Sequence, residues 1–221
     1  MTEIDFVEQA RFNMIEQQVR PWEVLDPRVL DTLSAVPRED FVPERYRKLA
    51  FSELSVPIGH GQATMPPALE GRVLQALSLK ASDTVLEIGS GSGFFCACLA
   101  RMCAHVESLE IFEDLSSSAA EKLRRHGIRN VELRVGDGAY GWPPGTRYDV
   151  IVLTGSVPTI PQSYLGQLNL DGRLFAVTGD SPAMVAELVT RVGDAQWARE
   201  SLFETDLPRL VNAERAPEFK L

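Results

Sequence analysis

The chain has 221 residues, of which 44% are hydrophobic and 24% charged, the composition of an ordinary soluble globular protein that can bury a core without disulfides or metal. Its formal net charge of −9 argues against a duplex nucleic-acid binder, because such proteins need a basic surface to displace counterions from phosphates. No apolar run approaches the ~20 residues of a membrane span, and the first residues carry no basic or apolar signal segment. We therefore expect a cytoplasmic protein that binds neither nucleic acid nor membranes.

The first 80 or so residues indicate helices interrupted by prolines. Asp26 followed by Pro27 predicts the N-cap of a helix over 26–36, whose apolar residues repeat on one face. The stretch 57–67 is rich in glycine and proline, which predicts a loop. A second amphipathic helix is expected over 68–79.

From residue 84 the chain alternates strands and helices. The expected strands are 84–89, 105–111, 131–138, 148–155 and 172–179, and the expected helices are 94–103, 114–127 and 161–168. Strands separated by helices imply right-handed crossovers and a parallel, doubly wound sheet. The cysteines Cys96, Cys98 and Cys103 share one short apolar stretch without the spacing of a metal clamp, so we expect reduced core residues and no metal.

The tail departs from this alternation. Residues 184–192 and 197–207 are joined by a short polar segment, which predicts an antiparallel hairpin at one edge of the sheet, although 186–191 could also be helical. The expected fold class is α/β: a doubly wound, mostly parallel, seven-stranded Rossmann-like sheet with an N-terminal helical lead-in and a C-terminal antiparallel hairpin.

A glycine-rich turn follows the first expected strand of this sheet. Gly89, Ser90, Gly91 and Gly93 let a ligand approach the backbone, because glycine has no side chain to block it. Phe94 stands where the dinucleotide fingerprint has glycine or alanine, so a pyrophosphate-binding turn is disfavoured.

Acidic residues follow the same order of strands. Glu87 lies near the carboxyl end of the first strand. Glu110, with Ile111 beside it, ends the second strand about 20 residues after Gly91, where a carboxylate accepts hydrogen bonds from ribose hydroxyls. Asp137 and Gly138 follow the third strand, where the carboxylate could accept from an adenine amino group. This set resembles the S-adenosylmethionine pocket of a seven-stranded methyltransferase.

The resemblance is closest to the protein-L-isoaspartate O-methyltransferases. It runs from about Met14 to Gly179 and is carried by VLDTLSAVPREDFVP, VPIGHGQ, VLEIGSGSGF, VESLE, NVELRVGDGAYGWP, YDVIVLTG and QLNLDGRLFAVTG. Membership implies S-adenosylmethionine as cofactor and methyl transfer to the free carboxylate of an L-isoaspartyl residue in damaged protein. The length of 221 residues favours one domain over two very small ones. We expect one methyltransferase domain over 1–221, with a substrate-side extension at 1–80, a cofactor core at 81–180 and the hairpin at 181–221.

The substrate loop departs from the family pattern. The family usually reads Gly-Gln-Thr-Ile-Ser-x-Pro, whereas here Ala63 replaces the threonine and Met65 replaces the serine assigned to the active site. Thr64 could supply a replacement hydroxyl, and Met65 either packs against cofactor and helix or reshapes the pocket for a less polar acceptor. His60 is a candidate base if the acceptor is a hydroxyl, and otherwise a surface histidine.

These changes leave the acceptor open. A carboxylate is ionised at neutral pH and needs no base, so losing one hydroxyl that held it costs roughly 1–3 kcal/mol. The sequence predicts an isoaspartyl methyltransferase first. An enzyme acting on a small metabolite or another carboxylate, and a cofactor-binding module without turnover, are the alternatives; a nicotinamide oxidoreductase is disfavoured by Phe94.

Overall fold

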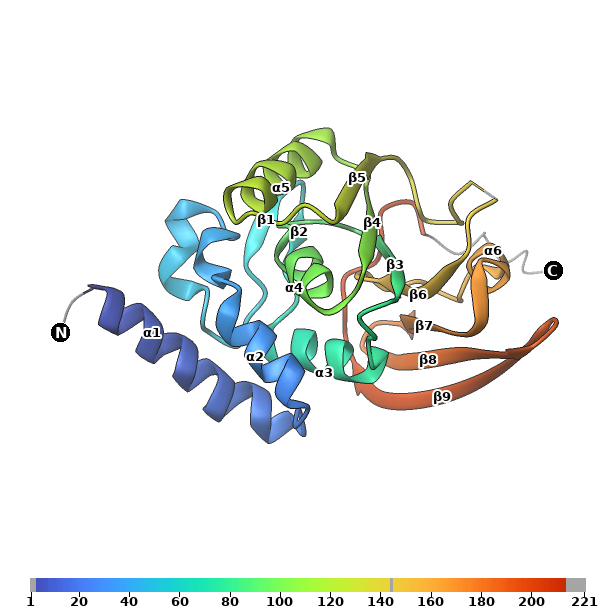
Figure 1. The fold of residues 1–221 in the computed structure, drawn as a ribbon, viewed down its shortest axis with the longest axis horizontal. Helices are drawn as coiled ribbons and strands as arrows, with labels where there is room; N and C mark the ends of the chain where they lie inside the picture. The colour runs from blue at the N-terminus through green and yellow to red at the C-terminus, as the bar shows by residue number, and fades with distance from the viewer. Residues whose placement is uncertain (1–2, 144, 214–221) are drawn as a thin grey trace.

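The computed structural model describes residues 3–143 and 145–213. Its main feature is a seven-stranded sheet in the order β5-β4-β3-β6-β7-β8-β9 (Figure 1). β3 to β7 are parallel and β8 and β9 antiparallel, which confirms the predicted fold class. The strands are β3 (Thr84–Ile88), β4 (His105–Glu110), β5 (Val131–Val135), β6 (Tyr148–Leu153), β7 (Leu168–Asp180), β8 (Ala183–Gly193) and β9 (Gln196–Thr205).

The central strands are buried on both faces, as expected for a parallel sheet covered by helices. Along β3, Val85 belongs to the core cluster on one face and Leu86 to the cluster on the other; Val152 and Leu153 of β6 divide in the same way. This alternation fixes the register, because a slip by one residue would exchange the two faces.

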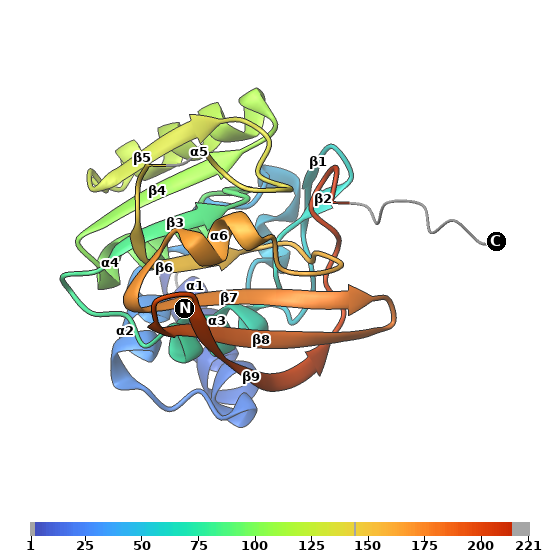
Figure 2. The same cartoon turned by 90° about the vertical axis from the view of Figure 1, so that its right-hand side faces the viewer.

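Helices cover the two faces unequally. α3 (Pro67–Leu77), α4 (Phe94–Met102) and α2 (Pro27–Ala35) share one core cluster, and the short α6 (Gln162–Gly166) belongs to the other. Figures 1 and 2 show α6 on the opposite side of the sheet from these helices. α5 (Glu113–Arg125) follows β4 and contacts both β4 and β5. The three cysteines are free and buried, as predicted.

The helical lead-in precedes this sheet. α1 (Glu3–Met14) continues into the π-helical turn η1 (Ile15–Val19) and the 3₁₀ turn η2 (Arg20–Trp22); two more 3₁₀ turns, η3 (Arg38–Asp40) and η4 (Glu44–Leu49), follow α2. Asp26 caps α2 as predicted, since its carboxylate accepts from the Arg28 amide at 2.9 Å. The sequence did not single out α1 as a separate helix. Within the described ranges, no helix combines the length and apolar character that crossing a bilayer requires.

The structure corrects one sequence expectation and decides between two others. The stretch read as a loop over 57–67 contains a small antiparallel hairpin, β1 (Pro57–Gly59) with β2 (Gln62–Ala63). The strands were not predicted because a glycine-rich stretch is typical of a loop; here Gly59 and Gly61, with positive φ, form the turn of the hairpin. The tail forms the predicted hairpin, β8 with β9, so the helical alternative for 186–191 is wrong.

Arg38 joins the lead-in to the core. Its side chain is 1% exposed; Nε donates to the Ala50 carbonyl at 2.8 Å and Nη2 to the Met65 carbonyl at 2.8 Å. Nη1 forms an ion pair with the buried carboxylate of Glu70 on α3. The guanidinium also lies over the Phe94 ring of α4, 4.7 Å from its centroid. One buried cation therefore connects η3, α3, α4 and the segment between β2 and α3.

We predict that Arg38→Met lowers the free energy of unfolding by about 3–5 kcal/mol, because it leaves the buried carboxylate of Glu70 without its partner. Urea denaturation followed by circular dichroism measures this. The double variant Arg38→Met/Glu70→Gln should recover part of the loss, since the uncompensated charge is gone. Arg20→Met, which removes an exposed i,i+4 ion pair with Glu16, is the control and should change stability by less than about 1 kcal/mol. Equal losses in Arg38→Met and Arg20→Met would contradict this role.

Candidate active site

A pocket of about 900 Å³, its open mouth included, lies at the carboxyl ends of β3, β4, β5 and β6. Doubly wound sheets bind ligands at this edge, and the size suits a small organic cofactor. Three further segments complete the wall: the β1–β2 hairpin with the residues after it, the start of α5, and residues 207–211 beyond β9. Figure 2 shows the segment after β9 running beside the β1–β2 hairpin.

The turn after β3 has the backbone shape that the glycines predicted. Gly89, Gly91 and Gly93 have φ of +100°, +51° and +85°. A Cβ on Gly89 would collide with Thr154 Oγ1, and one on Gly93 would lie 3.0 Å from the Ala119 Cβ. Gly89 and Gly91 line the pocket with bare backbone, whereas Gly93 begins α4 and lets the turn approach α5. The turn is thus a cradle that side chains at these positions would fill.

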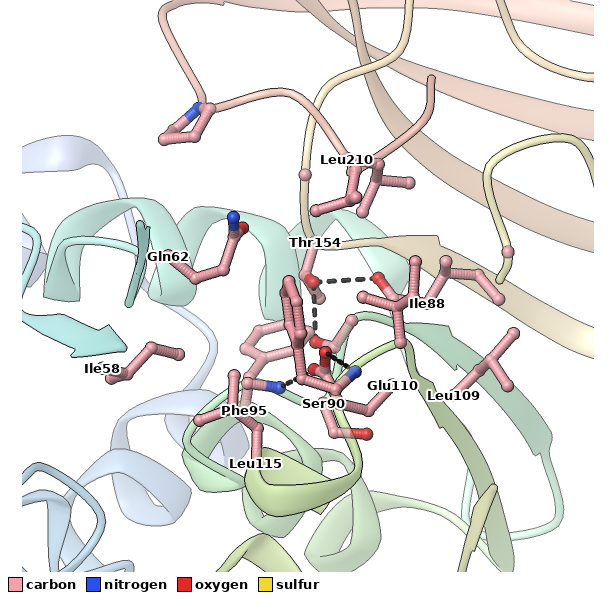
Figure 3. Close-up of a pocket in the computed structure, with 18 of the residues that line it drawn as sticks. Ile58, Gln62, Ile88, Ser90, Phe95, Leu109, Glu110, Leu115, Thr154 and Leu210 are labelled. Carbon is pink, nitrogen blue, oxygen red and sulfur yellow. Dashed lines mark hydrogen bonds between the residues drawn. The ribbon is translucent and has the colours of Figure 1, made fainter. Parts of the chain in front are cut away.

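Glu110 is placed at the pocket as predicted. Its side chain is 5% exposed, Oε2 accepts from the Gly91 amide at 2.8 Å, and Oε1 accepts from the Phe112 amide at 3.1 Å (Figure 3). Each carboxylate oxygen keeps a second lone pair, so the group can still accept hydrogen bonds from a ligand diol. Ile111, next in the chain, also lines the pocket.

Asp137 and Gly138 follow β5 at the same edge. The Asp137 carboxylate accepts from the Ala139 amide at 2.9 Å and from the Asn212 side-chain amide at 2.8 Å. A Cβ on Gly138 would lie 2.7 Å from Ile88 Cγ2, so this position also brings bare backbone to the pocket. The contact with Asn212 was not foreseen, because it joins residues that are far apart in the sequence.

Glu87 occupies a different place from the other carboxylates. It does not line the pocket; it is fully buried and accepts a hydrogen bond from the Ser108 hydroxyl. Ser108 in turn bonds the hydroxyl of Ser90, which lines the pocket, at 2.6 Å. Burial raises the pKa of Glu87 to about 8. The residue therefore stands behind the glycine turn and reaches the pocket only through the two serines.

The loop residues Ala63, Thr64 and Met65 all line the pocket. The Thr64 hydroxyl oxygen accepts from the Val56 amide at 3.1 Å and from Arg38 Nη2 at 3.3 Å. Met65 is 6% exposed and belongs to the main core cluster. Thr64 is thus tied to the scaffold, and Met65 presents an apolar surface.

His60 lies at the tip of the β1–β2 hairpin and does not line the pocket. Its ring stacks on Phe112 with centroids 4.1 Å apart, and Nε2 lies 2.8 Å from the Asp114 carboxylate. The hydrogen bond with His60 lowers the pKa of Asp114. His60 thus holds the hairpin against the start of α5. Phe112, on which its ring stacks, is itself one of the residues that line the pocket.

Other lining residues were not identified from the sequence. Gln62, Thr154 and Arg209 line the pocket, and Figure 3 shows Gln62 and Thr154 below Leu210. Thr154 lies within the quoted YDVIVLTG motif, but nothing in that motif marked its hydroxyl. Arg209 lies beyond the motifs, in a tail whose path no periodicity predicted.

We predict that Glu87→Gln flattens the pH dependence of stability. Because the folded-state pKa of Glu87 is raised from 4.5 to about 8, the folded protein binds this proton more tightly than the unfolded chain does. The free energy of unfolding therefore falls as pH rises through this window and levels off above it. Between pH 5 and 8.5 the unmodified protein should lose roughly 1–3 kcal/mol more than Glu87→Gln, measured by urea denaturation. Parallel curves for the two proteins would contradict the assignment.

Comparisons with known proteins identify the family. A model of the protein-L-isoaspartate(D-aspartate) O-methyltransferase family matches residues 9–212. Protein-L-isoaspartate O-methyltransferase 1 of Rhodopseudomonas palustris (strain HaA2) is 40% identical over 205 residues, which are 92% of this chain and 84% of that protein.

Two solved structures are similar over most of the chain. A protein-L-isoaspartate O-methyltransferase has a TM-score of 0.75 at 25% identity, over 91% of this chain and 65% of that one. A putative protein-L-isoaspartate O-methyltransferase from Plasmodium falciparum, solved with S-adenosyl-L-homocysteine, has a TM-score of 0.75 at 19% identity, over 92% and 97% of the two chains, and supports the fold. The chain therefore belongs to the protein-L-isoaspartate O-methyltransferase family of S-adenosylmethionine-dependent methyltransferases, as the sequence motifs indicated.

Proposed function

We propose that this protein transfers the methyl group of S-adenosylmethionine to the free carboxylate of an L-isoaspartyl residue in a protein or peptide. The observation that carries the proposal is the pocket itself, in which a bare-backbone turn, Glu110 and Asp137 meet at one edge of the sheet in a chain of this family. A small-molecule acceptor stays the alternative.

The residues fit the cofactor. In our proposal Glu110 and Ile111 hold the ribose, while Asp137 and Gly138 hold the adenine. Gly89, Ser90 and Gly91 face the methionine part, and Gly93 sets the turn against α5. The glycine cradle supports this, because a side chain at Gly89 or Gly138 would collide with its neighbours. Glu87 supports the turn from behind through Ser108 and Ser90.

The bound cofactor would supply an electrophilic methyl on a sulfonium, which is a good leaving group. An isoaspartyl carboxylate is ionised at neutral pH, so the protein needs no general base and acts by aligning the acceptor and excluding water. Ile58, Phe95 and Leu115 give the pocket apolar walls suited to that task. This fits a site in which Thr64 is tied to Arg38 and His60 does not line the pocket.

We assign the three loop residues accordingly. Thr64 and Met65 shape the acceptor side of the pocket, and His60 positions the hairpin through Phe112 and Asp114. We further propose that residues 1–221 act as one domain in the cytoplasm, with residues 1–80 on the acceptor side, and that nucleic acids and membranes are not partners.

We predict that Glu110→Gln weakens binding of S-adenosylhomocysteine about 10- to 100-fold in calorimetry. The substitution removes a charged acceptor for the ribose hydroxyls. It also places the NH2 group of the new side chain against a backbone amide that donates to the Glu110 carboxylate in the unmodified protein. Glu113→Gln is the matched control: it removes an exposed carboxylate three residues along that does not line the pocket, and it should bind as the unmodified protein does. Equal affinities for both variants would remove Glu110 from the site.

We also predict methyl transfer from labelled S-adenosylmethionine to an isoaspartyl peptide and none to the same peptide with a normal aspartyl linkage. The two peptides differ only in which carboxylate is free, so the comparison tests the acceptor directly. Background incorporation into both, with labelling of small molecules in a metabolite extract, would favour the alternative acceptor.

A further inference from the structure

Gln62 contributes a polar side chain to the acceptor-side wall of the pocket. It lies on β2 of the β1–β2 hairpin and is half-buried, and it lines the pocket together with Ile58 of β1 (Figure 3). The hairpin is held in place at its tip, where the His60 ring stacks on Phe112. Gln62 therefore projects from a short strand that is fixed on the rest of the protein.

The carboxamide of Gln62 is only partly used by the protein. Nε2 donates one long hydrogen bond, of 3.3 Å, to the His60 carbonyl. The carboxamide atom near that carbonyl must be the nitrogen, because two oxygens facing each other would repel. The second N–H and Oε1 have no hydrogen-bond partner among the residues that the structure describes. One donor and one acceptor are therefore free on the same planar group.

Thr64 is less accessible on the same wall. It is 8% exposed, and its hydroxyl oxygen already accepts from the Val56 amide and from Arg38, neither of which lines the pocket. Glu70, deeper in the lining, is paired with the same arginine. These polar groups hold the wall together from behind, whereas Gln62 is open to a ligand.

The polar side chains on the other walls are also committed. The Thr154 hydroxyl donates to two backbone carbonyls, at 2.9 and 2.7 Å. Arg209 directs Nη2 to the Gly179 carbonyl and the Asp180 carboxylate, and its Nη1 is shielded from solvent, so the guanidinium is turned away from a pocket ligand. The remaining polar lining side chains belong to the glycine turn and strand ends that we assign to the cofactor: Ser90, Ser92, Glu110 and Asp137.

A free donor beside a free acceptor matches a peptide main chain. A residue in an extended chain presents its N–H and C=O along the same edge, as residues of paired antiparallel strands do. One carboxamide can bond both groups, since Nε2 donates to the C=O and Oε1 accepts from the N–H. A carboxylate would use only the donor and would leave Oε1 facing a negative charge. The chemistry of Gln62 therefore suits the main chain of an acceptor better than its carboxylate.

We propose that Gln62 is a specificity-determining residue that binds the main chain of the acceptor peptide beside its isoaspartyl carboxylate. This inference rests on the proposed function, since it names the contact that distinguishes a peptide acceptor from a small carboxylate. The carboxamide takes no part in the methyl transfer itself. It holds the main chain at the hairpin so that the carboxylate enters the pocket, and a small carboxylate without a main-chain amide lacks this contact.

The first test compares the unmodified protein with Gln62→Met, which keeps the length of the side chain but removes its donor and acceptor. The control is Gln9→Met, which changes an exposed glutamine of α1 that does not line the pocket. Gln62→Met should raise KM for an isoaspartyl peptide about 5- to 50-fold, with a much smaller change in kcat and unchanged affinity for S-adenosylhomocysteine. Unchanged cofactor affinity also shows that the variant is folded. Gln9→Met should match the unmodified protein.

Peptides that contain one ester bond identify the group that Gln62 binds. In each peptide an ester replaces the amide before or after the isoaspartyl residue, which removes one main-chain N–H and leaves the free carboxylate intact. With the unmodified protein, one of the two esters should raise KM about 3- to 10-fold over the all-amide peptide. With Gln62→Met the same ester should change KM by less than about twofold, because the acceptor of the missing N–H is already gone.

The outcomes separate the inference from the proposed function. Turnover of the isoaspartyl peptide with unchanged KM in Gln62→Met, or with the same ester penalty in Gln62→Met as in the unmodified protein, would overturn the inference and leave the proposed function intact. So would an ester penalty that disappears in Thr64→Val instead, since Thr64 would then hold the main chain. No isoaspartyl turnover by the unmodified protein would overturn both.

Discussion

The close approach of Gly89 to Thr154 is the constraint on which the site depends. The Thr154 hydroxyl donates to the carbonyls of Ile88 and Gly89, so the ends of β3 and β6 are held together where both strands leave the sheet. That approach leaves no room for a Cβ on Gly89 and requires its positive φ. The chain then turns so that the Gly91 amide reaches Glu110 at the end of β4. Three neighbouring strands thereby contribute to one pocket through backbone geometry.

The acceptor side is held by different forces. Arg38 fixes the Met65 carbonyl and Glu70, and His60 fixes the tip of the β1–β2 hairpin against Phe112. These are side-chain contacts between segments that are distant in sequence. The buried ion pair stabilises its charges only while both partners are present, so the position of this wall depends on a few polar contacts.

This difference explains what the sequence could predict. Strand periodicity, the glycine turn and the spacing from Gly91 to Glu110 are local or follow from the βαβ unit, and the structure places these residues as expected. The sequence missed the strands around Gly59 and Gly61, since a glycine-rich stretch resembles a loop. It also expected Glu87 to lie among the pocket carboxylates, whereas the pleat of β3 turns that side chain into the interior behind Ser90. The sequence did not identify Arg209 as a lining residue, because the position of Arg209 depends on the pairing of its segment with Ser156.

The same difference bears on how an enzyme of this kind can change its acceptor. The cofactor half uses backbone positions and conformations that few residues tolerate, as at Gly89 and Gly138. The acceptor half uses side chains that can be exchanged without disturbing the sheet. Ala63 and Met65 give this wall side chains without hydroxyls. The residues that hold the acceptor can therefore change while the fold and the cofactor pocket stay as they are.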